Sequence, residues 1–508
     1  MYQTIIFLSI VEVIPKNEYH YNMPTIDELK KVRLEKLKSL QDAGLLAYPA
    51  KTKRTHSIVQ ALENFTKIAK SKKEIVLVGR IMALRGHGGA TFLDVNDGTE
   101  KIQGLIKEDK VGEKGYHFFI DHFDIGDFVE LKGALIETKR GEKTIEATDY
   151  QMLSKSLLPL PEKWHGLQDV EEKLRKRYLD ILFNPEVKEM VKKRAVFWNA
   201  MREFLLEKNF LEVETPVLEV TTGGADAKPF ATHHNALDID VFLRISTGEL
   251  WQKQLMVAGF EKTFEIGRQF RNEGMDAEHL QDYTQMEFYW AYADYKMGME
   301  LVEELYKYVI KKAFGTLKFT IKDFTVDFGK KWEVYDYQTI INKYAKIDIF
   351  EASLIEMENQ LQKLGIAYDK NGFNKTRAID NLWKYCRKNL SGPGFLINLP
   401  VDVSPLAKRD EKNPKIAQRF QVILAGSEMG NGYSELNDPL DQYARFEEQQ
   451  ALRAAGDEEA QMFNSDFVEA LEYGMPPTCG FGVSERLFSF LMNKPARETQ
   501  IFPLMKPR

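Results

Sequence analysis

The sequence contains little that would suit an oxidising compartment or a zinc site. Its 508 residues include only two cysteines, Cys386 and Cys479, which lie far apart and have no metal-ligand spacing. We therefore expect no disulfide framework, and a reduced cytoplasm is the simpler location. The adjacent histidines His233 and His234 would point to opposite faces of a strand instead of converging on one ion.

A long hydrophobic run is missing as well. The apolar stretch nearest the start, Ile5 to Ile14, contains Ser9 and Glu12 and is too short to span a bilayer. No basic segment precedes it and no small-residue cleavage site follows, so it is a poor signal peptide. We expect residues 1–22 to be a disordered extension, because they precede the first amphipathic segment.

The sequence also has no excess of positive charge. Lys and Arg number 70 against 76 Asp and Glu, a net charge of −6, so overall charge does not indicate nucleic-acid binding. A hydrophobic content of 44% and a charged content of 29% are ordinary for a globular protein. At this length we expect two or three domains.

The first third of the chain reads as one helix followed by short strands. Apolar residues recur at helical spacing from Thr25 to Ala43, and Gly44 ends the pattern. The alternating stretches that follow are Glu74–Ala83, Ala90–Val95, Lys101–Ile106, Asp127–Glu137 and Lys143–Leu153. Five short strands suit a small barrel of the OB type, which commonly binds oligonucleotides. A purely structural β-domain is the alternative.

The remainder mixes helices and strands, so the predicted fold class is α+β. The helices that we expect are an amphipathic one from Pro185 to Asn209 and others near residues 297–313, 352–364, 444–455 and 466–473. The predicted division is an N-terminal helix and OB-type barrel over residues 23–157, a linker over 158–180 that begins Leu-Pro-Leu-Pro, and a second domain over 181–508.

Two runs in the second domain combine an apolar face with a charged one. Read as strands, residues 264–273 place Glu265, Gly267, Gln269, Arg271 and Glu273 on one face, opposite Phe264, Ile266 and Phe270. Residues 285–290 likewise place Gln285, Glu287 and Tyr289 opposite Met286, Phe288 and Trp290. A solvated sheet face is one interpretation. The other is a binding site, because an arginine, several carboxylates and a tyrosine suit a phosphate, a cation and a planar ring.

The segment Phe270-Arg271-Asn272-Glu273 resembles motif 2 of the class II aminoacyl-tRNA synthetases. Leu211-Glu-Val-Glu-Thr-Pro-Val217 resembles motif 1, and Gly482-Val-Ser-Glu-Arg-Leu487 resembles motif 3. Within the class, the chain is similar to lysyl-tRNA synthetase from about Thr25 to Pro507, including Thr232-His-His-Asn-Ala-Leu-Asp238 and Gly430-Asn-Gly-Tyr-Ser-Glu-Leu-Asn-Asp-Pro439. The resemblance implies an OB-fold anticodon-binding domain, a catalytic domain with an antiparallel sheet flanked by helices, and a homodimer assembled through motif 1.

The resemblance also implies a lysine pocket. It assigns Glu249 to the α-amino group of lysine, and Glu287 and Glu435, with Tyr289 and Asn431, to the ε-ammonium group; Tyr433 lines the pocket. Buried carboxylates are costly unless a cation or hydrogen-bond donors meet them. Carboxylates at these positions would repel aspartate, which disfavours the related aspartyl and asparaginyl enzymes. The alternative interpretation of each glutamate, taken alone, is an ordinary surface residue.

For ATP, the resemblance implies that Arg271 binds the α-phosphate and Arg486 the γ-phosphate, as the catalytic residues. Glu273 would accept a hydrogen bond from the adenine amino group, Tyr283 would stack on adenine, and His279 would lie near the phosphates. No protein nucleophile is needed, because positioning and charge neutralisation drive the reaction.

Magnesium marks a departure from the family. Glu428 matches one of two carboxylates that hold Mg²⁺, but the other position is Gln421, a neutral ligand. The number of bound ions is therefore open. Motif 3 is one residue shorter than usual, Ser246-Thr-Gly-Glu249 is one residue longer than the usual Ala-Pro-Glu, and Leu280 replaces an Asn.

In the barrel, Arg80, Phe92 and Gln103 match anticodon contacts of the family, and Asp149 stands where a Glu is usual. Phe92 could stack on an unpaired base or, as the alternative, pack in the core. The expected function is a cytoplasmic lysine–tRNA ligase with ATP, L-lysine and tRNA(Lys) as partners and no membrane. The rivals are another class II synthetase, a paralogue that lysylates a protein, and a non-catalytic RNA-binding paralogue.

Overall fold

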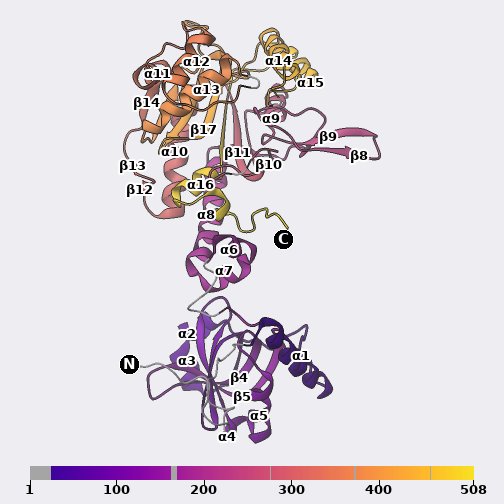
Figure 1. The fold of residues 1–508 in the computed structure, drawn as a ribbon. Coiled ribbons are helices and arrows are strands. Elements are labelled where there is room, and N and C mark those ends of the chain that lie inside the picture. The colour runs from indigo at the N-terminus through magenta and orange to yellow at the C-terminus, as the bar shows by residue number, and fades with distance from the viewer. Residues whose placement is uncertain (1–23, 162–168, 275, 371–372, 458, 508) are drawn as a thin grey trace. The chain divides into compact units, whose positions relative to one another are not determined.

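The computed structural model describes residues 24–161, 169–274, 276–370, 373–457 and 459–507. The chain divides into two compact units, Met1–Gly166 and Leu167–Arg508, which are described separately (Figure 1). The predicted extension of residues 1–22 lies outside the described residues. Among the described residues, no helix is both long and apolar enough to cross a membrane.

The N-terminal unit opens with helix α1, Ile26–Asp42. The helix begins at Thr25 with a capping box, in which the backbone N–H of Glu28 donates to Thr25 Oγ1 and the Glu28 carboxylate accepts from the backbone of Thr25. These bonds satisfy backbone donors that would otherwise lack partners in the first turn. Two short helices follow, α2 (Ile58–Glu63) and α3 (Phe65–Ser71).

Five strands then close into a barrel in the order β1-β2-β3-β5-β4. They are β1 (Ile75–His87), β2 (Ala90–Asn96), β3 (Lys101–Lys107), β4 (Phe128–Glu137) and β5 (Lys143–Ser154), with α4 (Glu108–Val111) and α5 (Glu113–His122) between β3 and β4. Alternate residues such as Leu93 and Val95 fill the interior. The predicted five-stranded barrel is confirmed.

The predicted linker is partly helical. Helix α6 covers Val170–Arg175 and α7 covers Arg177–Phe183, so both lie in the second unit. Asp169 caps α6 by accepting from the backbone N–H of Glu172. The sequence pattern missed these helices because each is too short to show a full amphipathic period.

The second unit is built on an eight-stranded sheet in the order β14-β15-β16-β17-β18-β11-β10-β6, mostly antiparallel, with parallel pairs at its two edges. Its strands are β6 (Leu211–Glu212), β10 (Lys262–Phe270), β11 (Asp282–Ala291), β14 (Glu333–Asp336), β15 (Gly394–Ile397), β16 (Arg419–Leu424), β17 (Ser427–Ser434) and β18 (Thr478–Ser484). A mixed sheet flanked by helices agrees with the predicted α+β class.

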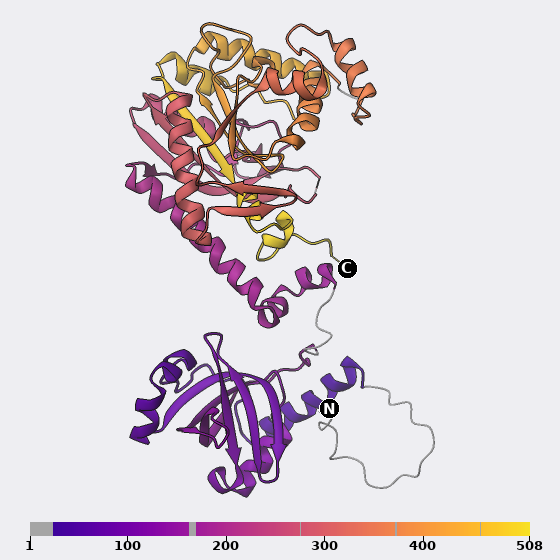
Figure 2. The same cartoon turned by 90° about the vertical axis from the view of Figure 1, so that its left-hand side faces the viewer.

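Two long helices, α8 (Pro185–Glu207) and α10 (Tyr295–Phe314), lie side by side against one face of this sheet (Figures 1 and 2). Met286 and Phe288 of β11 point into this core, together with Phe420 and Phe481 of neighbouring strands. The alternation of β11 therefore turns Glu287 and Tyr289 to the opposite face, as predicted.

Further elements complete the second unit. A helical insertion with its own core contains α11 (Tyr337–Ala345), α12 (Leu354–Lys363) and α13 (Lys375–Cys386). The other helices are α9 (Glu249–Val257), α14 (Pro439–Ala454), α15 (Ser465–Glu472), α16 (Arg486–Leu491) and α17 (Ala496–Thr499). The remaining strands are β7 (Leu218–Glu219), β8 (Ala231–His234) and β9 (Ile239–Leu243), which form a small sheet, and the hairpin β12 (Lys318–Ile321) and β13 (Phe324–Asp327).

Candidate active site

One cavity of about 430 Å³ opens on the polar face of the eight-stranded sheet. The site residues that the sequence predicts in this unit all line it: Glu249, Arg271, Glu273, His279, Tyr283, Glu287, Tyr289, Gln421, Glu428, Asn431, Tyr433, Glu435 and Arg486. They come from three strands (β11, β16 and β17), the starts of two helices (α9 and α16), the loop after β10 and the residue after β17, and they span more than 200 positions of the chain. Their convergence gives the cavity a carboxylate-rich end and an arginine-containing end.

Strand β10 ends earlier than predicted. Its pairing with β11 stops at Phe270, opposite Asp282, so Arg271 and Glu273 lie on the following loop instead of on the strand. Backbone N–H groups of Arg271 and Asn272 donate to Gln281 and Lys228 carbonyls, each at 2.7 Å. Both predicted side chains still line the cavity. Glu265, on the same predicted face, instead pairs behind the cavity with Arg244 at 2.6 Å.

The carboxylate-rich end contains Glu249, Glu287 and Glu435, which are all buried. Glu287 accepts three hydrogen bonds, from the backbone N–H of Thr247 at 2.7 Å, from Gln285 Nε2 at 2.6 Å and from Tyr289 Oη at 3.0 Å. The Tyr433 hydroxyl donates to Glu249. These donors hold two of the three carboxylates in place.

Glu435 differs from the other two. It is only 1% exposed, yet neither of its carboxylate oxygens accepts an aligned hydrogen bond from the described residues. Burial raises the pKa of both Glu435 and Glu287 above the usual carboxyl value, and neighbouring carboxylates raise it further. A buried carboxylate without donors is unfavourable unless a cation reaches it.

Two glycines make room for this arrangement. Gly248 adopts φ +69°, and a Cβ there would lie 2.1 Å from Thr215 Oγ1, so the turn that starts α9 at Glu249 requires glycine. A Cβ on Gly480 of β18 would lie 2.1 Å from a carboxylate oxygen of Glu435. The neighbouring strand thus leaves the space that the Glu435 carboxylate occupies.

Sequence reasoning missed Lys253, which is buried one helical turn after Glu249 in α9. Its Nζ lies 2.7 Å from Glu249 Oε1 and 2.6 Å from Glu435 Oε2. A Glu and a Lys four positions apart are usual on a solvated helix face. One observation in the sequence could have pointed to Lys253, namely that Glu249, four positions earlier, was itself a predicted site residue.

The arginine-containing end holds Arg271 and Arg486. The Arg271 guanidinium lies 5.8 Å from the centre of the Tyr283 ring, with Glu273 nearby on the cavity wall. The Arg486 guanidinium pairs with Glu278, whose carboxylate also lies 2.9 Å from Lys322 Nζ. Glu278 follows Asp276, which binds His279 Nδ1 at 2.8 Å. Glu278 was not predicted, because a lone glutamate in a polar loop has no distinguishing pattern.

The Glu428 carboxylate, predicted as a magnesium ligand, accepts from Trp383 Nε1 at 2.6 Å and Arg387 Nη1 at 3.2 Å, both from the helical insertion, and from Gln421 Nε2 at 2.8 Å. The Gln421 amide oxygen is buried without a hydrogen-bond partner. No cluster of three or more acidic, His or Cys side chains suited to a metal occurs among the described residues. One carboxylate and one free amide oxygen fit Mg²⁺ that ATP phosphates also hold.

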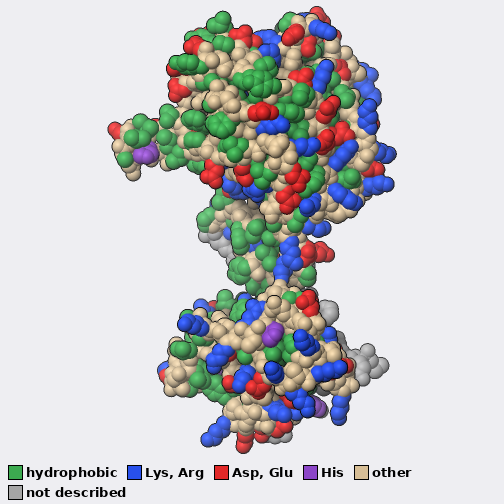
Figure 3. Space-filling view, turned by 180° about the vertical axis from the view of Figure 1, so that it is seen from behind, with side chains coloured by type: hydrophobic (Ala, Val, Ile, Leu, Met, Phe, Trp, Pro, Cys, Tyr) green, Lys and Arg blue, Asp and Glu red, His purple; other side chains and the backbone are tan. Residues whose placement is uncertain are grey.

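The predicted anticodon residues lie in the N-terminal unit. Cross-strand pairing places Phe92 opposite Arg85 and Leu105, while its neighbours Thr91 and Leu93 are buried, so Phe92 belongs to the outer face of the barrel. Gln103 pairs with Asp94 on that face, and Arg80 lies 4.3 Å from the Phe128 ring centre. Asp149 is exposed on β5. Figure 3 shows basic side chains interspersed with acidic ones over this unit.

Comparison with known proteins points to one family. Residues 169–506 match the family described as tRNA synthetases class II (D, K and N), and residues 75–153 match the OB-fold nucleic acid binding domain. The chain is 42% identical to a lysine–tRNA ligase of Thermosipho africanus over 95% of this chain and 97% of that protein. It is 43% identical to one of Pelotomaculum thermopropionicum and 42% identical to one of Thermotoga maritima, each over 95% of this chain.

Proposed function

The chain belongs to the lysine–tRNA ligases of class II, and on that premise we propose that its cavity joins lysine to ATP and passes the lysyl group to tRNA(Lys). The observation that carries the proposal is the group of three buried carboxylates, Glu249, Glu287 and Glu435, whose charge the buried cation Lys253 offsets only in part. Such a group calls for a cationic ligand. Lysine, with two ammonium groups, satisfies it.

In the activation step, a carboxylate oxygen of lysine attacks the α-phosphorus of ATP. A bond forms between that oxygen and phosphorus, the bond to the bridging oxygen of the β-phosphate breaks, and pyrophosphate leaves. Glu249 holds the α-ammonium group, while Glu287 and Glu435 hold the ε-ammonium group. Arg271 neutralises charge that develops at the α-phosphate, and this positioning supplies the catalysis.

The nucleotide occupies the arginine-containing end. Tyr283 offers a ring face for adenine, Glu273 accepts from the adenine amino group, and Arg486 binds the γ-phosphate near His279. Because Arg486 pairs with Glu278 in this structure, the phosphates take over that guanidinium when ATP binds. In the second step a hydroxyl at the 3′ end of tRNA attacks the lysyl carbonyl and AMP leaves.

Magnesium, carried with ATP, would offset the charge of the phosphates. Glu428 and the free amide oxygen of Gln421 are the groups on this chain that would hold it. Hydrogen bonds from Trp383 and Arg387 fix the position of the Glu428 carboxylate at the wall of the cavity.

The barrel supplies recognition of tRNA. We assign Arg80, Phe92, Gln103 and Asp149 to the anticodon, supported by the position of Phe92 outside the barrel core. We also propose the cytoplasm as the place of action and a homodimer as the assembly. Exposed apolar side chains at Leu211, Val217 and Val220, around the motif 1 segment, support the dimer. Light scattering would then give about twice the chain mass of 58.7 kDa.

Amino-acid-dependent exchange of pyrophosphate into ATP, measured with each of the twenty amino acids, tests the proposed function. Lysine should support the fastest exchange. Faster exchange with aspartate or asparagine would assign the chain to a related enzyme. Absence of exchange with all of them would favour the non-catalytic paralogue.

A further inference from the structure

Lys253 is a fully buried lysine behind two carboxylates, Glu249 and Glu435, that line the cavity. Its side chain is 1% exposed and its Nζ bridges Glu249 and Glu435 at 2.7 and 2.6 Å. The other groups that face Nζ are the rings of Tyr433 at 5.4 Å and of Phe467, from α15, at 5.8 Å. Lysine is almost never fully buried unless it is paired, so these two carboxylates explain its presence.

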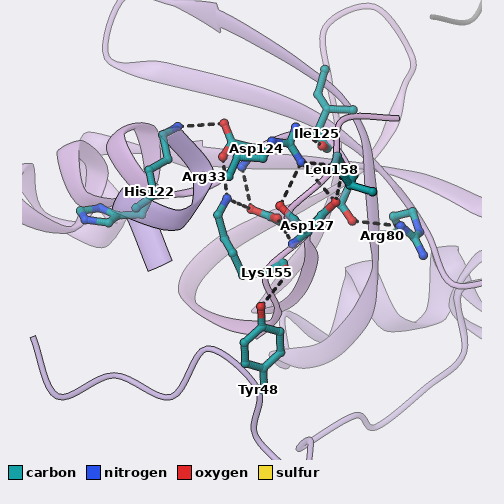
Figure 4. Close-up of polar contacts among 12 residues, drawn as sticks. Arg33, Tyr48, Arg80, His122, Asp124, Ile125, Asp127, Lys155 and Leu158 are labelled. Carbon is teal, nitrogen blue, oxygen red and sulfur yellow. Dashed lines mark hydrogen bonds and ion pairs between the residues drawn. The ribbon is translucent and has the colours of Figure 1, made fainter. Parts of the chain in front are cut away.

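The N-terminal unit contains a second buried lysine between two carboxylates, which shows what a structural cluster looks like (Figure 4). Lys155 Nζ lies 2.7 Å from Asp127 and also pairs with Asp124. Every oxygen of these two aspartates accepts a hydrogen bond, including those from the backbone of Ser156 and from Lys36. Such closure is what makes a buried ion pair tolerable in a core.

The cluster around Lys253 is open by comparison. Glu435 has the ion pair with Lys253 but no aligned hydrogen bond, and its carboxylate lines the cavity. Glu249 receives Lys253 and the Tyr433 hydroxyl and also lines the cavity. The missing partners are therefore on the cavity side, where the substrate binds.

The charges of this end of the cavity can be counted. In their ionised forms, which a nearby ammonium group favours, Glu249, Glu287 and Glu435 contribute three negative charges, and Lys253 contributes one positive charge. Two negative charges are left, equal to the number of ammonium groups on lysine. The carboxylate of lysine is outside this count, because Arg271 and Arg419 line the same cavity and suit an anion.

We propose that Lys253 is a positioning residue that sets the net charge of the amino-acid pocket, so that two negative charges meet a substrate with two ammonium groups. This inference rests on the proposed function, and it adds a specificity determinant that does not itself contact lysine. It acts by bridging Glu249 and Glu435, which fixes their positions and offsets their mutual repulsion.

Removing Lys253 should leave three uncompensated carboxylates. Burial already raises the pKa of Glu435, and Lys253 opposes that rise. In Lys253→Met the carboxyl groups should therefore hold protons at neutral pH and lose their charge toward the substrate. If Lys253 were purely structural, its loss would lower the stability of the protein and would not specifically change KM for the substrate lysine.

The test measures KM for lysine and for ATP in the exchange assay for four proteins: wild type, Lys253→Met, Glu435→Gln and the double variant. Lys253→Met should raise KM for lysine about tenfold or more at about pH 7 and less at about pH 8.5, with a much smaller effect on KM for ATP. Lys155→Met is the matched control. It also loses a buried lysine between two carboxylates, so it should lower Tm and leave KM for lysine unchanged.

The double variant keeps the inference testable even if Lys253→Met fails to fold, because replacing both partners of a buried ion pair leaves no unpaired charge. Glu435→Gln alone leaves one net negative charge, whereas the double variant has two again. Its KM for lysine should therefore be lower than that of Glu435→Gln, by about threefold or more. A KM equal to or above that of Glu435→Gln would overturn the proposal. Failure of wild type to use lysine would instead overturn the proposed function.

Discussion

The side-chain amide of Gln421 donates a 2.8 Å hydrogen bond to the carboxylate of Glu428. Gln421 is on β16 and Glu428 on β17, on either side of a register shift between these strands, and the resemblance to the family implies two carboxylates at these positions. Because Gln421 is neutral, it does not repel the Glu428 carboxylate. The Gln421 amide oxygen is left as a single free acceptor on the cavity wall.

This pair predicts how the enzyme depends on magnesium. In Gln421→Glu two carboxylates would stand side by side and repel each other until a cation binds between them. The magnesium concentration that gives half-maximal exchange should fall severalfold, whereas Glu428→Gln should nearly abolish exchange. Glu447→Gln, an exposed change on α14, is the control and should leave the magnesium dependence as it is. An unchanged dependence in Gln421→Glu would show that another group holds the ion.

The pairing of Arg486 with Glu278 predicts a competition for ATP. The Glu278 carboxylate occupies the guanidinium that we assign to the γ-phosphate. Glu278→Gln removes this competing charge, so KM for ATP should fall by about threefold, while KM for lysine stays constant. Glu300→Gln on α10 serves as the comparison. A higher KM for ATP in Glu278→Gln would mean that Glu278 assists nucleotide binding.

The buried carboxylates predict the pH dependence of lysine binding. Burial raises the pKa of Glu287 and Glu435, so each gains a proton at a higher pH than an exposed carboxyl does. A protonated carboxyl cannot pair with an ammonium group, hence KM for lysine should rise as pH falls from about 8 to about 6. Glu287→Gln removes one titrating group and should show a higher KM with a weaker pH dependence. The same steep dependence in that variant would contradict this assignment.

The outer face of the barrel predicts a separable effect on tRNA. Phe92→Ala should weaken tRNA charging about tenfold or more through lost base stacking, and leave lysine-dependent exchange nearly intact. Leu93→Ala, at the next position but inside the barrel core, should instead destabilise the unit by about 2–5 kcal/mol. If Phe92→Ala reduced tRNA charging and exchange equally, Phe92 would be a residue that supports folding and not a tRNA contact.

Local patterns in the sequence predicted much of the fold. Alternation along β11 separated Glu287 and Tyr289 from Met286 and Phe288, because a strand has only two faces. The same rule extended β10 three residues too far, since alternation cannot say where cross-strand pairing stops. The helices α6 and α7 were missed because they are short.

Partners that are distant in the chain could not be predicted in the same way. Trp383 and Arg387 reach Glu428 from the helical insertion, and nothing near either residue indicates that contact. Lys253 has the spacing of a surface ion pair with Glu249, and only its burial against Glu435 distinguishes it. The roles of the individual site residues stay predictions until variants are measured.

The most direct test of the central claim is aminoacylation of total tRNA by the purified protein with labelled amino acids. We predict that lysine alone is attached efficiently and that it is attached to tRNA(Lys). Attachment of aspartate or asparagine to their own tRNAs, or attachment of lysine to none, would contradict the account.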